Sequence, residues 1–219
     1  MIEDFCFGCN RLLADGERLV CSHCLDRFPL VFSDREQNPL WLKFCGKVEF
    51  EHATTLGYYQ TDDVFARLIV AAKYGGRPFV NKMLTQLLLK RLAGSDWPYD
   101  IDVIVPVPVH WLRLLKRGYN QVSPVVHTLS KAWGIPVEKR CLVKGRYTGS
   151  QVGRNAQQRG ENENGSFSLR HPERLEGKHV LLVDDVCTTG STLIACADTL
   201  RQVKGVRVSF LTLGLTLSQ

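Results

Sequence analysis

The stretch Val180–Thr192, VLLVDDVCTTGST, decides the fold. Its four apolar residues lead directly into two adjacent carboxylates, Asp184 and Asp185, and a hydroxyl-rich run with one glycine follows. An uninterrupted apolar run is typical of a strand that is buried on both faces, as in a parallel sheet covered by helices. The apolar spacing over residues 193–203 predicts a helix directly afterwards. The stretch therefore predicts a strand over residues 179–183, a loop and a helix.

The loop of this unit is predicted to lie at the carboxyl edge of the sheet, where open α/β folds bind ligands. The amides of residues 187–191 would face outward at a helix N-terminus, which favours an anion. The acid pair offers oxygens that can hold sugar hydroxyls or a hydrated Mg²⁺. A polar turn with no ligand is the alternative, and it is disfavoured because adjacent carboxylates repel each other. Amides for a phosphate beside carboxylates for a diol predict a ribose 5-phosphate site.

The same stretch resembles the phosphoribosyl pyrophosphate (PRPP) motif of type I phosphoribosyltransferases. The shared pattern is four apolar residues, two acids, two further residues and then Thr-Thr-Gly-x-Thr. The resemblance implies that Asp184 and Asp185 are the catalytic pair and hold the ribose hydroxyls, with Mg²⁺ bound together with PRPP. The PRPP-binding residues are then predicted to be Asp184, Asp185, Cys187, Thr188, Thr189, Gly190, Ser191 and Thr192.

Length and composition limit the class of protein. A chain of 219 residues can bury one sizeable α/β core plus a small appendage. A hydrophobic content of 44% and a charged content of 23% are ordinary for a soluble globular protein. No apolar run approaches the roughly 18 residues that span a membrane, and the N-terminus lacks the apolar core of a signal peptide. We therefore predict a cytoplasmic protein.

Positive charge is concentrated in one part of the chain. Residues 111–160 carry ten Lys or Arg residues and a single acid, Glu138, for a net charge of +9. Such a segment suits phosphates, either of a small substrate or of nucleic acid. Aromatic residues, among them Trp111, Tyr119 and Tyr147, lie among these cations, so single-stranded DNA is a predicted partner. A solvated basic face with no ligand is the alternative.

Four of the eight cysteines form two Cys-x-x-Cys pairs, Cys6 with Cys9 and Cys21 with Cys24. Two such pairs can place four thiolates tetrahedrally around one ion, so we predict a structural zinc site with these four cysteines as ligands. A redox-active pair is the alternative, and a disulfide is disfavoured in a reducing compartment. His23 could replace a cysteine ligand but is predicted to be a solvated neighbour, and Cys45 is predicted to be a small buried residue.

The chain is predicted to have three parts. Residues 1–30 form the zinc-binding module, with two short strands around a turn at Asp15-Gly16; residues 31–53 form a connector, and residues 54–219 form the main domain. In the main domain, predicted strands alternate with helices predicted after residue 61 and over 79–93 and 120–133. The predicted strands cover residues 55–59, 102–105, 135–143, 179–183 and 206–213. This alternation predicts a doubly wound, mainly parallel α/β sheet.

Two further stretches carry candidate ligand contacts. After Pro106-Val107-Pro108 come Arg117, Gly118 and Asn120, where Arg117 could grip a diphosphate and Asn120 could cap the next helix. Residues 145–165 are glycine-rich and lack apolar periodicity, which favours a lid that closes over the site. Its predicted ligand-contacting residues are Gln151, Arg154 and Arg159. A basic surface turn and a disordered insertion are the respective alternatives.

These motifs in this order resemble the ComF family of competence and DNA-utilisation proteins. The matching residues are the two Cys pairs, Lys73-Tyr74-Gly75-Gly76-Arg77, Pro106-Val107-Pro108, Arg117–Gln121, Gln151, Arg159, Asn162, Phe167 and the 180–192 stretch.

The ComF resemblance implies a type I phosphoribosyltransferase fold behind an N-terminal zinc finger, and a role in DNA uptake with the uptake machinery as partner. An active phosphoribosyltransferase with an unidentified acceptor, or a PRPP-sensing regulator without DNA contact, stays open. Homo-oligomerisation also stays open.

Overall fold

The central element of the fold is a four-stranded sheet. The structure is a computed structural model that describes residues 5–31, 38–61, 63–74, 77–109, 119–145 and 167–217. The strand order is β1-β6-β5-β2, and all three pairings are parallel. The strands are β1 (Ala53–Tyr58), β2 (Val103–Pro106), β5 (His179–Cys187) and β6 (Arg207–Leu215). The predicted parallel α/β sheet is confirmed.

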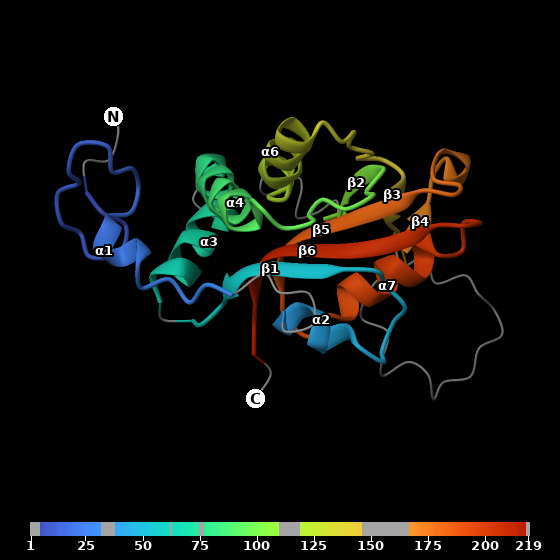
Figure 1. Cartoon of the computed structure of the whole chain (residues 1–219), viewed down its shortest axis with the longest axis horizontal. Coiled ribbons are helices and arrows are strands. Elements are labelled where there is room, and N and C mark those ends of the chain that lie inside the picture. The colour runs from blue at the N-terminus through green and yellow to red at the C-terminus, as the bar shows by residue number, and fades with distance from the viewer. Residues whose placement is uncertain are drawn as a thin grey trace.

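Helices cover both faces of this sheet, and Figure 1 shows the three layers. One face carries α3 (Val64–Tyr74), α4 (Pro78–Leu92) and α6 (Ser123–Trp133), and the other carries α2 (Pro39–Phe44) and α7 (Ser191–Leu200). The side chains of the central strand β5 pack against the helices of both layers, because successive side chains of a strand point to opposite faces. Leu181 and Val183 belong to the first core cluster, while Val180 and Leu182 belong to the second. This double burial explains the apolar run before the acid pair.

The acid-bearing strand is longer than the sequence predicted. It continues through both aspartates to Cys187, so the loop before α7 shrinks to residues 188–190. The neighbouring strand β6 explains the extension, because it pairs with β5 as far as Cys187, opposite Leu215. The acids are therefore held by the ladder itself rather than by a loose strand end.

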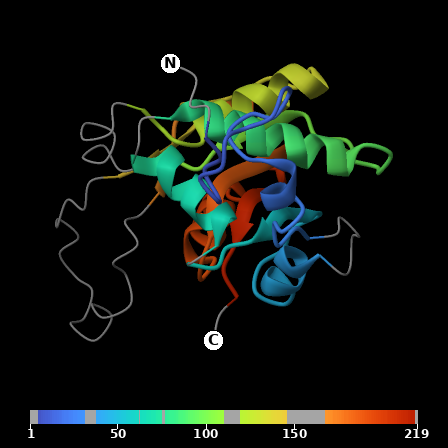
Figure 2. The same ribbon diagram turned by 90° about the vertical axis from the view of Figure 1, so that its left-hand side faces the viewer.

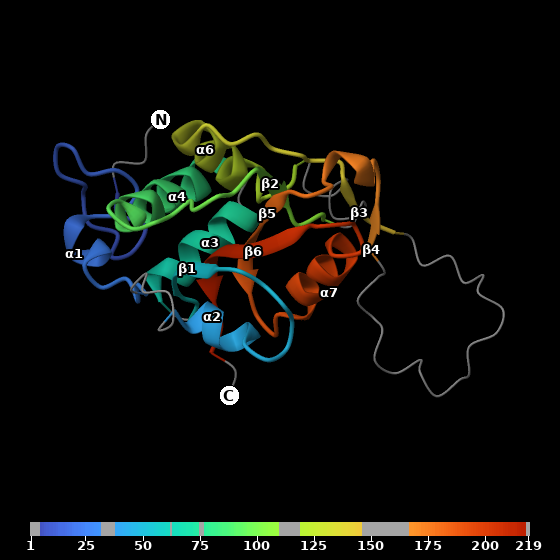
Figure 3. The same cartoon turned by 45° about the vertical axis from the view of Figure 1, so that its right-hand side comes forward.

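The predicted strand over residues 135–143 is wrong in most of its length. A parallel bridge between Ile104 and Val137 remains, and β3 (Leu142–Lys144) pairs antiparallel with β4 (Phe167–Leu169) outside the main sheet. Pro136 has no amide to donate to a ladder, and the polar residues 138–140 have no apolar face to bury. Figure 3 shows β3 and β4 at the β2 side of the molecule, and the short 3₁₀ helix η2 (Pro172–Arg174) follows β4.

The N-terminal residues 5–31 dock on α3, as Figure 2 shows. The two strands predicted here are reduced to isolated bridges, Phe5 with Leu12 and Arg18 with Val20, and α1 (Ser22–Leu25) follows. Phe28 packs edge-on against Phe65 of α3, with ring centroids 5.5 Å apart. The docked segment thus shares the core cluster of the sheet face that α3 covers.

Residues 29–31 run along the outer edge of β1. The amide of Tyr58 donates to the carbonyl of Pro29 at 2.8 Å, and Val31 donates to Leu56 at 2.9 Å. A covered edge is protected against pairing with another chain.

No helix in the described ranges is long and apolar enough to cross a bilayer.

The connector helix α2 packs on the opposite sheet face. Leu40 and Phe44 are fully buried, and the Phe44 ring lies 4.6 Å from the Phe210 ring of β6. The expectation of a buried Cys45 is wrong, because this thiol is exposed where α2 ends and the chain turns back toward the solvent.

Candidate functional site

The two neighbouring carboxylates at the end of β5 face different surroundings. Asp184 lines a small cleft with residues of the loop and of the first turn of α7, namely Val186, Cys187, Thr188, Thr189, Gly190, Thr192 and Leu193. Asp185 is buried and contacts the end of α3 instead. The alternation of side chains along a strand explains this division, which the sequence analysis did not foresee.

Asp184 is held in a position that disfavours its charge. Burial, and next the charge of Asp185, raise the pKa of Asp184 well above its ordinary value, although the amide of Asp185 and the charge of Lys73 oppose the shift. The Asp185 amide donates to Asp184 Oδ1 at 2.8 Å. A cation bound in the cleft would favour the ionised carboxylate, so the environment of Asp184 suits a metal-bearing ligand.

Lys73 pairs with the second acid and was not singled out as a site residue from sequence. Its Nζ lies 3.2 Å from Asp185 Oδ2, and the Asp185 side chain is 6% exposed. Asp185 Oδ2 is buried and accepts no aligned hydrogen bond among the described residues, so the ion pair with Lys73 compensates its charge. The signal in the sequence was the cationic helix end Lys73-Tyr74, but its partner 112 positions away could not be read from spacing.

The loop and the start of α7 bring amides and hydroxyls together. Thr188 and Thr189 are exposed, Gly190 has no side chain to cap the helix, and the amide of Ser191 donates to Thr189 Oγ1 at 3.4 Å. Thr189 Oγ1 and Ser191 Oγ lie 2.9 Å apart. Open amides at the N-terminus of a helix of this length carry partial positive charge, which favours a phosphate group. The amides and hydroxyls predicted to hold a phosphate are therefore brought together.

Cys187 lies at the start of this loop and links it to the rest of the domain. Its thiol is buried, and burial raises the pKa to about 12 despite the opposing charges of Lys43 and Lys47. The carbonyl of Cys187 accepts the amide of Thr216 at 2.9 Å, which fastens the start of the loop to the segment after β6. The thiol is therefore neutral at physiological pH and can contact a ligand as a packing group.

Gly190 fits the loop to the connector helix. Its φ is +86°, a left-handed conformation that glycine adopts readily, and a Cβ built there would lie 2.8 Å from Phe44 Cε1. The ring of Phe44 is fully buried against Phe210, so it has little room to move. Glycine is required here for its backbone conformation and for the close approach of an aromatic ring.

We expect Gly190→Ala to lower the free energy of unfolding by about 2–5 kcal/mol, because a left-handed conformation costs about 1–2 kcal/mol and overpacking about 1–3 kcal/mol. Urea denaturation would measure the change. Gly134→Ala is the matched control, since Gly134 also has a left-handed φ of +72° but nothing lies within 4 Å of its added Cβ. Equal losses in the two variants would contradict a role for the Phe44 contact.

In the stretch that follows Pro106-Val107-Pro108, the structure describes Val109 and the residues from Tyr119 onward. The prediction that Asn120 caps the next helix is wrong, because α6 begins after Val122 without a side-chain cap. Asn120 Oδ1 instead accepts the amide of Val122 at 3.0 Å and shapes the turn before α6, while its amide group donates to Val107 O. Tyr119 donates its hydroxyl to Ala72 O at 2.6 Å, which links this stretch to α3 beside Lys73. The other predicted contacts, Arg117, Gly118, Gln151, Arg154 and Arg159, lie outside the described residues, as does most of the predicted lid.

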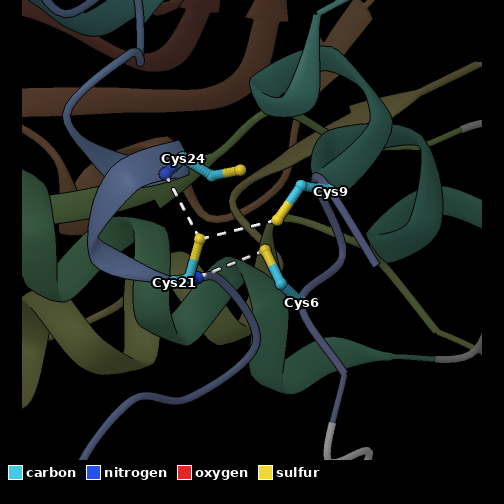
Figure 4. Close-up of side chains that lie close together, drawn as sticks. All are labelled: Cys6, Cys9, Cys21 and Cys24. Carbon is cyan, nitrogen blue, oxygen red and sulfur yellow. Dashed lines mark hydrogen bonds between the residues drawn. The ribbon is translucent and has the colours of Figure 1, made fainter. Parts of the chain in front are cut away.

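The four N-terminal cysteines form a cluster that can bind one metal ion, shown in Figure 4. Their sulfur atoms all lie within 4.8 Å of one another, and Cys9 Sγ is 3.7 Å from Cys21 Sγ. Tetrahedral thiolate bonds of about 2.3 Å give sulfur–sulfur distances of about 3.8 Å. Backbone amides already point at the sulfurs: Cys21 N donates to Cys6 Sγ at 3.2 Å, and Cys24 N donates to Cys21 Sγ at 3.4 Å.

The pKa values of the cysteine thiols in this cluster indicate that a cation is needed to ionise all four. Burial opposes ionisation of Cys6, yet the amides of Cys21, Cys9 and Gly8 together lower the pKa of its thiol to about 6. Burial and the neighbouring thiols raise the pKa of Cys24 to about 12, so four thiolates do not form without a cation. His23 is exposed and stands apart from the cluster of four cysteines, as expected for a solvated neighbour.

A parallel sheet whose central strand ends in two carboxylates, followed by an open helix N-terminus, defines the class of phosphoribosyltransferase domains. Residues 37–214 match the family described as the phosphoribosyl transferase domain, and the chain belongs to this family. The match begins inside the predicted connector and so includes α2.

Two relatives match almost the whole chain. Competence protein F of Haemophilus influenzae is 26% identical, over 90% of this chain and 91% of its own length. DNA utilization protein YhgH of Escherichia coli O157:H7 is 31% identical, over 90% of this chain and 78% of its own. The predicted membership of the ComF family is thereby confirmed.

Among solved structures, adenine phosphoribosyltransferase from Thermoanaerobacter pseudethanolicus is 18% identical over 70% of this chain and 86% of that one, with a TM-score of 0.41.

Proposed function

We propose that this chain acts in the uptake or utilisation of DNA and that its phosphoribosyltransferase domain binds Mg-PRPP or a related phosphoribosyl ligand. The observation that carries the proposal is the cleft in which Asp184 faces the loop and the first turn of α7. The names of the two full-length relatives support the role in DNA handling.

In this proposal the 5-phosphate lies on the amides and hydroxyls of residues 188–192, and the ribose hydroxyls donate to the acid pair. Asp185 Oδ2 is buried and paired with Lys73, so Asp185 accepts a ribose hydroxyl only if its carboxylate turns toward the cleft when the ligand binds. Asp184 faces the cleft and accepts directly or through the water shell of Mg²⁺. Arg117 and the lid residues Gln151, Arg154 and Arg159 meet the diphosphate, with Gly118 and Asn120 shaping the turn.

We propose that zinc is the metal of the four-cysteine cluster and that it is structural. Four thiolates complete a tetrahedron and leave no position for a substrate. Cysteine-rich metal sites suit a reducing compartment, which supports the proposed cytoplasmic location. Residues 1–30 then form the zinc module and 54–219 the ligand-binding domain, against which α2 of the connector 31–53 packs.

Whether the bound PRPP reacts separates two versions of the function. In a transferase, a nucleophile attacks C1′ and expels pyrophosphate; in a sensor, the ligand biases another activity.

Isothermal titration with PRPP and saturating Mg²⁺ tests the proposal, with an expected Kd between about 1 μM and 1 mM, the range in which enzymes bind metabolites. Ribose 5-phosphate without a diphosphate is the control ligand and should bind more weakly. Absence of heat and of a thermal shift at millimolar PRPP would reject the proposal. Pyrophosphate release with a panel of nucleobases then separates the transferase from the sensor.

A further inference from the structure

A basic cavity of about 410 Å³ lies beyond the β2 edge of the sheet. It is much larger than the cleft beside Asp184 and shares no lining residue with it. Two short segments, residues 137–141 and 170–174, supply its walls. The first segment lies within the basic run of residues 111–160 that the sequence predicts to suit phosphates or nucleic acid, whereas the second segment was not predicted to contact a ligand.

The fold holds these two segments together. The first segment begins at Val137, which bridges to Ile104 of β2, and it leads into β3. The second follows β4, and the amide of Arg170 donates to the carbonyl of Cys141 at 2.6 Å. The pairing of β3 with β4 fixes both segments at the same end of the hairpin. The cavity is therefore a product of the tertiary fold and not of one basic run.

Four obligate cations line this cavity: Lys139, Arg140, Arg170 and Arg174. The acid among the lining residues is Glu138, whose Oε1 lies 3.8 Å from Arg174 Nη1. No described carboxylate forms an ion pair with Lys139, Arg140 or Arg170. Like charges gathered in one cavity repel each other, so an anionic ligand would relieve the repulsion.

We propose that this cavity is a second phosphate site, which takes the phosphodiester backbone of single-stranded DNA. Guanidinium groups bind phosphate oxygens with two parallel hydrogen bonds, and two of the three arginines carry no ion pair with a described acid. Among the described lining residues there is no Phe, Tyr or Trp to stack on a base, so the cavity suits backbone phosphates rather than a nucleoside.

One further cation lies on the same hairpin: Lys144 Nζ, at the end of β3, lies 5.3 Å from the ring centroid of Phe167 at the start of β4. A strand of nucleic acid that follows the hairpin from the cavity would meet this charge as well. The inference rests on the proposed role in DNA handling but not on the binding of PRPP.

The test is the affinity of the full chain for a fluorescein-labelled oligothymidylate, measured by fluorescence anisotropy over a series of salt concentrations. Arg140→Glu combined with Arg170→Glu should weaken binding at least tenfold, and the salt slope should fall by about 1.4, since each phosphate contact on a single strand contributes about 0.7. Both side chains are exposed, so the fold should persist. The milder pair Arg140→Gln and Arg170→Gln should give a smaller loss in the same direction.

Lys90→Glu combined with Lys131→Glu is the matched control, because it makes the same charge change at exposed positions of α4 and α6. This pair should alter the affinity less than about twofold, since its cations lie outside the cavity and make no phosphate contact. Equal losses in both pairs, or no loss in the cavity pair, would overturn the proposal. Displacement of the oligonucleotide by pyrophosphate at equal phosphate concentration would overturn it in favour of a small diphosphate ligand.

The same variants separate this site from the PRPP site. The cavity pair should bind Mg-PRPP with unchanged affinity, because the two clefts share no lining residue. If the unmodified chain binds no PRPP but loses DNA affinity with the cavity pair, the proposed function fails while the DNA site stands. The reverse outcome would reject the DNA site alone.

Discussion

Replacing Cys6 with serine is expected to unfold residues 5–31 and to lower the melting temperature of the whole chain. Structural zinc contributes on the order of 10–16 kcal/mol of apparent binding free energy, and a lost thiolate forfeits much of it. Cys6, Cys21 and Cys24 are also members of the core cluster that includes Phe65 of α3. The loss of the metal therefore removes packing from one face of the central sheet as well.

Hydrogen exchange followed by mass spectrometry would localise the effect of Cys6→Ser. Amides of residues 5–31 should lose protection, and those of β5 and β6 should keep it. Cys45→Ser is the control, since this exposed thiol lies outside the cluster. A Cys6→Ser protein that retains one equivalent of zinc and the original melting temperature would show that the four-thiolate site is not structural.

The second large effect is expected from Asp184→Asn, which should weaken Mg-PRPP binding about 100-fold or more. Hydrogen bonds to a charged group contribute about 1.5–3 kcal/mol each, and a carboxylate that serves two of them carries about 3 kcal/mol or more. The amide keeps the oxygen that accepts from Asp185 N, so the local backbone should be retained. Asp198→Asn, an equal charge change on the exposed side of α7, should leave binding unaltered.

The same substitution should stabilise the ligand-free protein at neutral pH. The pKa of Asp184 is raised on folding, so the native state binds the proton more tightly than the unfolded state. Stability is then full below the unfolded pKa of about 3.9 and falls as the pH rises toward the native pKa, at up to about 1.4 kcal/mol per pH unit. Asp184→Asn removes this decline. Denaturation curves between pH 4 and 8 that stay parallel for both proteins would contradict the assignment.

Local patterns predicted much of this fold and the position of its site. The apolar run before the acid pair indicated a strand buried on two faces, and both core clusters contain its side chains. The apolar spacing after the hydroxyls predicted the helix start at residue 193, two residues after α7 begins at Ser191. The prediction of a strand over 135–143 is wrong. The apolar residues near Ile135 indicated a strand, but Pro136 and the charged residues that follow do not suit one.

What sequence could not predict depends on contacts between distant segments. Lys73 of α3 meets Asp185 of β5, and Phe44 meets Gly190 from a helix assigned to the connector. The count of charges found a basic segment at residues 111–160 but placed Arg170 and Arg174 outside it. The pairing of β3 with β4 brings them to Lys139 and Arg140.

The contact between Phe44 and Gly190 has a consequence for the smallest fragment that can fold and bind. A fragment that starts at residue 54 lacks α2, and so it exposes the faces of Phe210 and Leu193 that Leu40 and Phe44 cover. The loop of residues 188–190 would then contact water instead of the aromatic ring of Phe44. Autonomy of the ligand-binding unit thus requires a start before Asn38, whose side chain begins α2 by accepting the amide of Leu40. Across relatives, the sizes of the residues at 44 and 190 should vary together, a larger one at either position requiring a smaller one at the other.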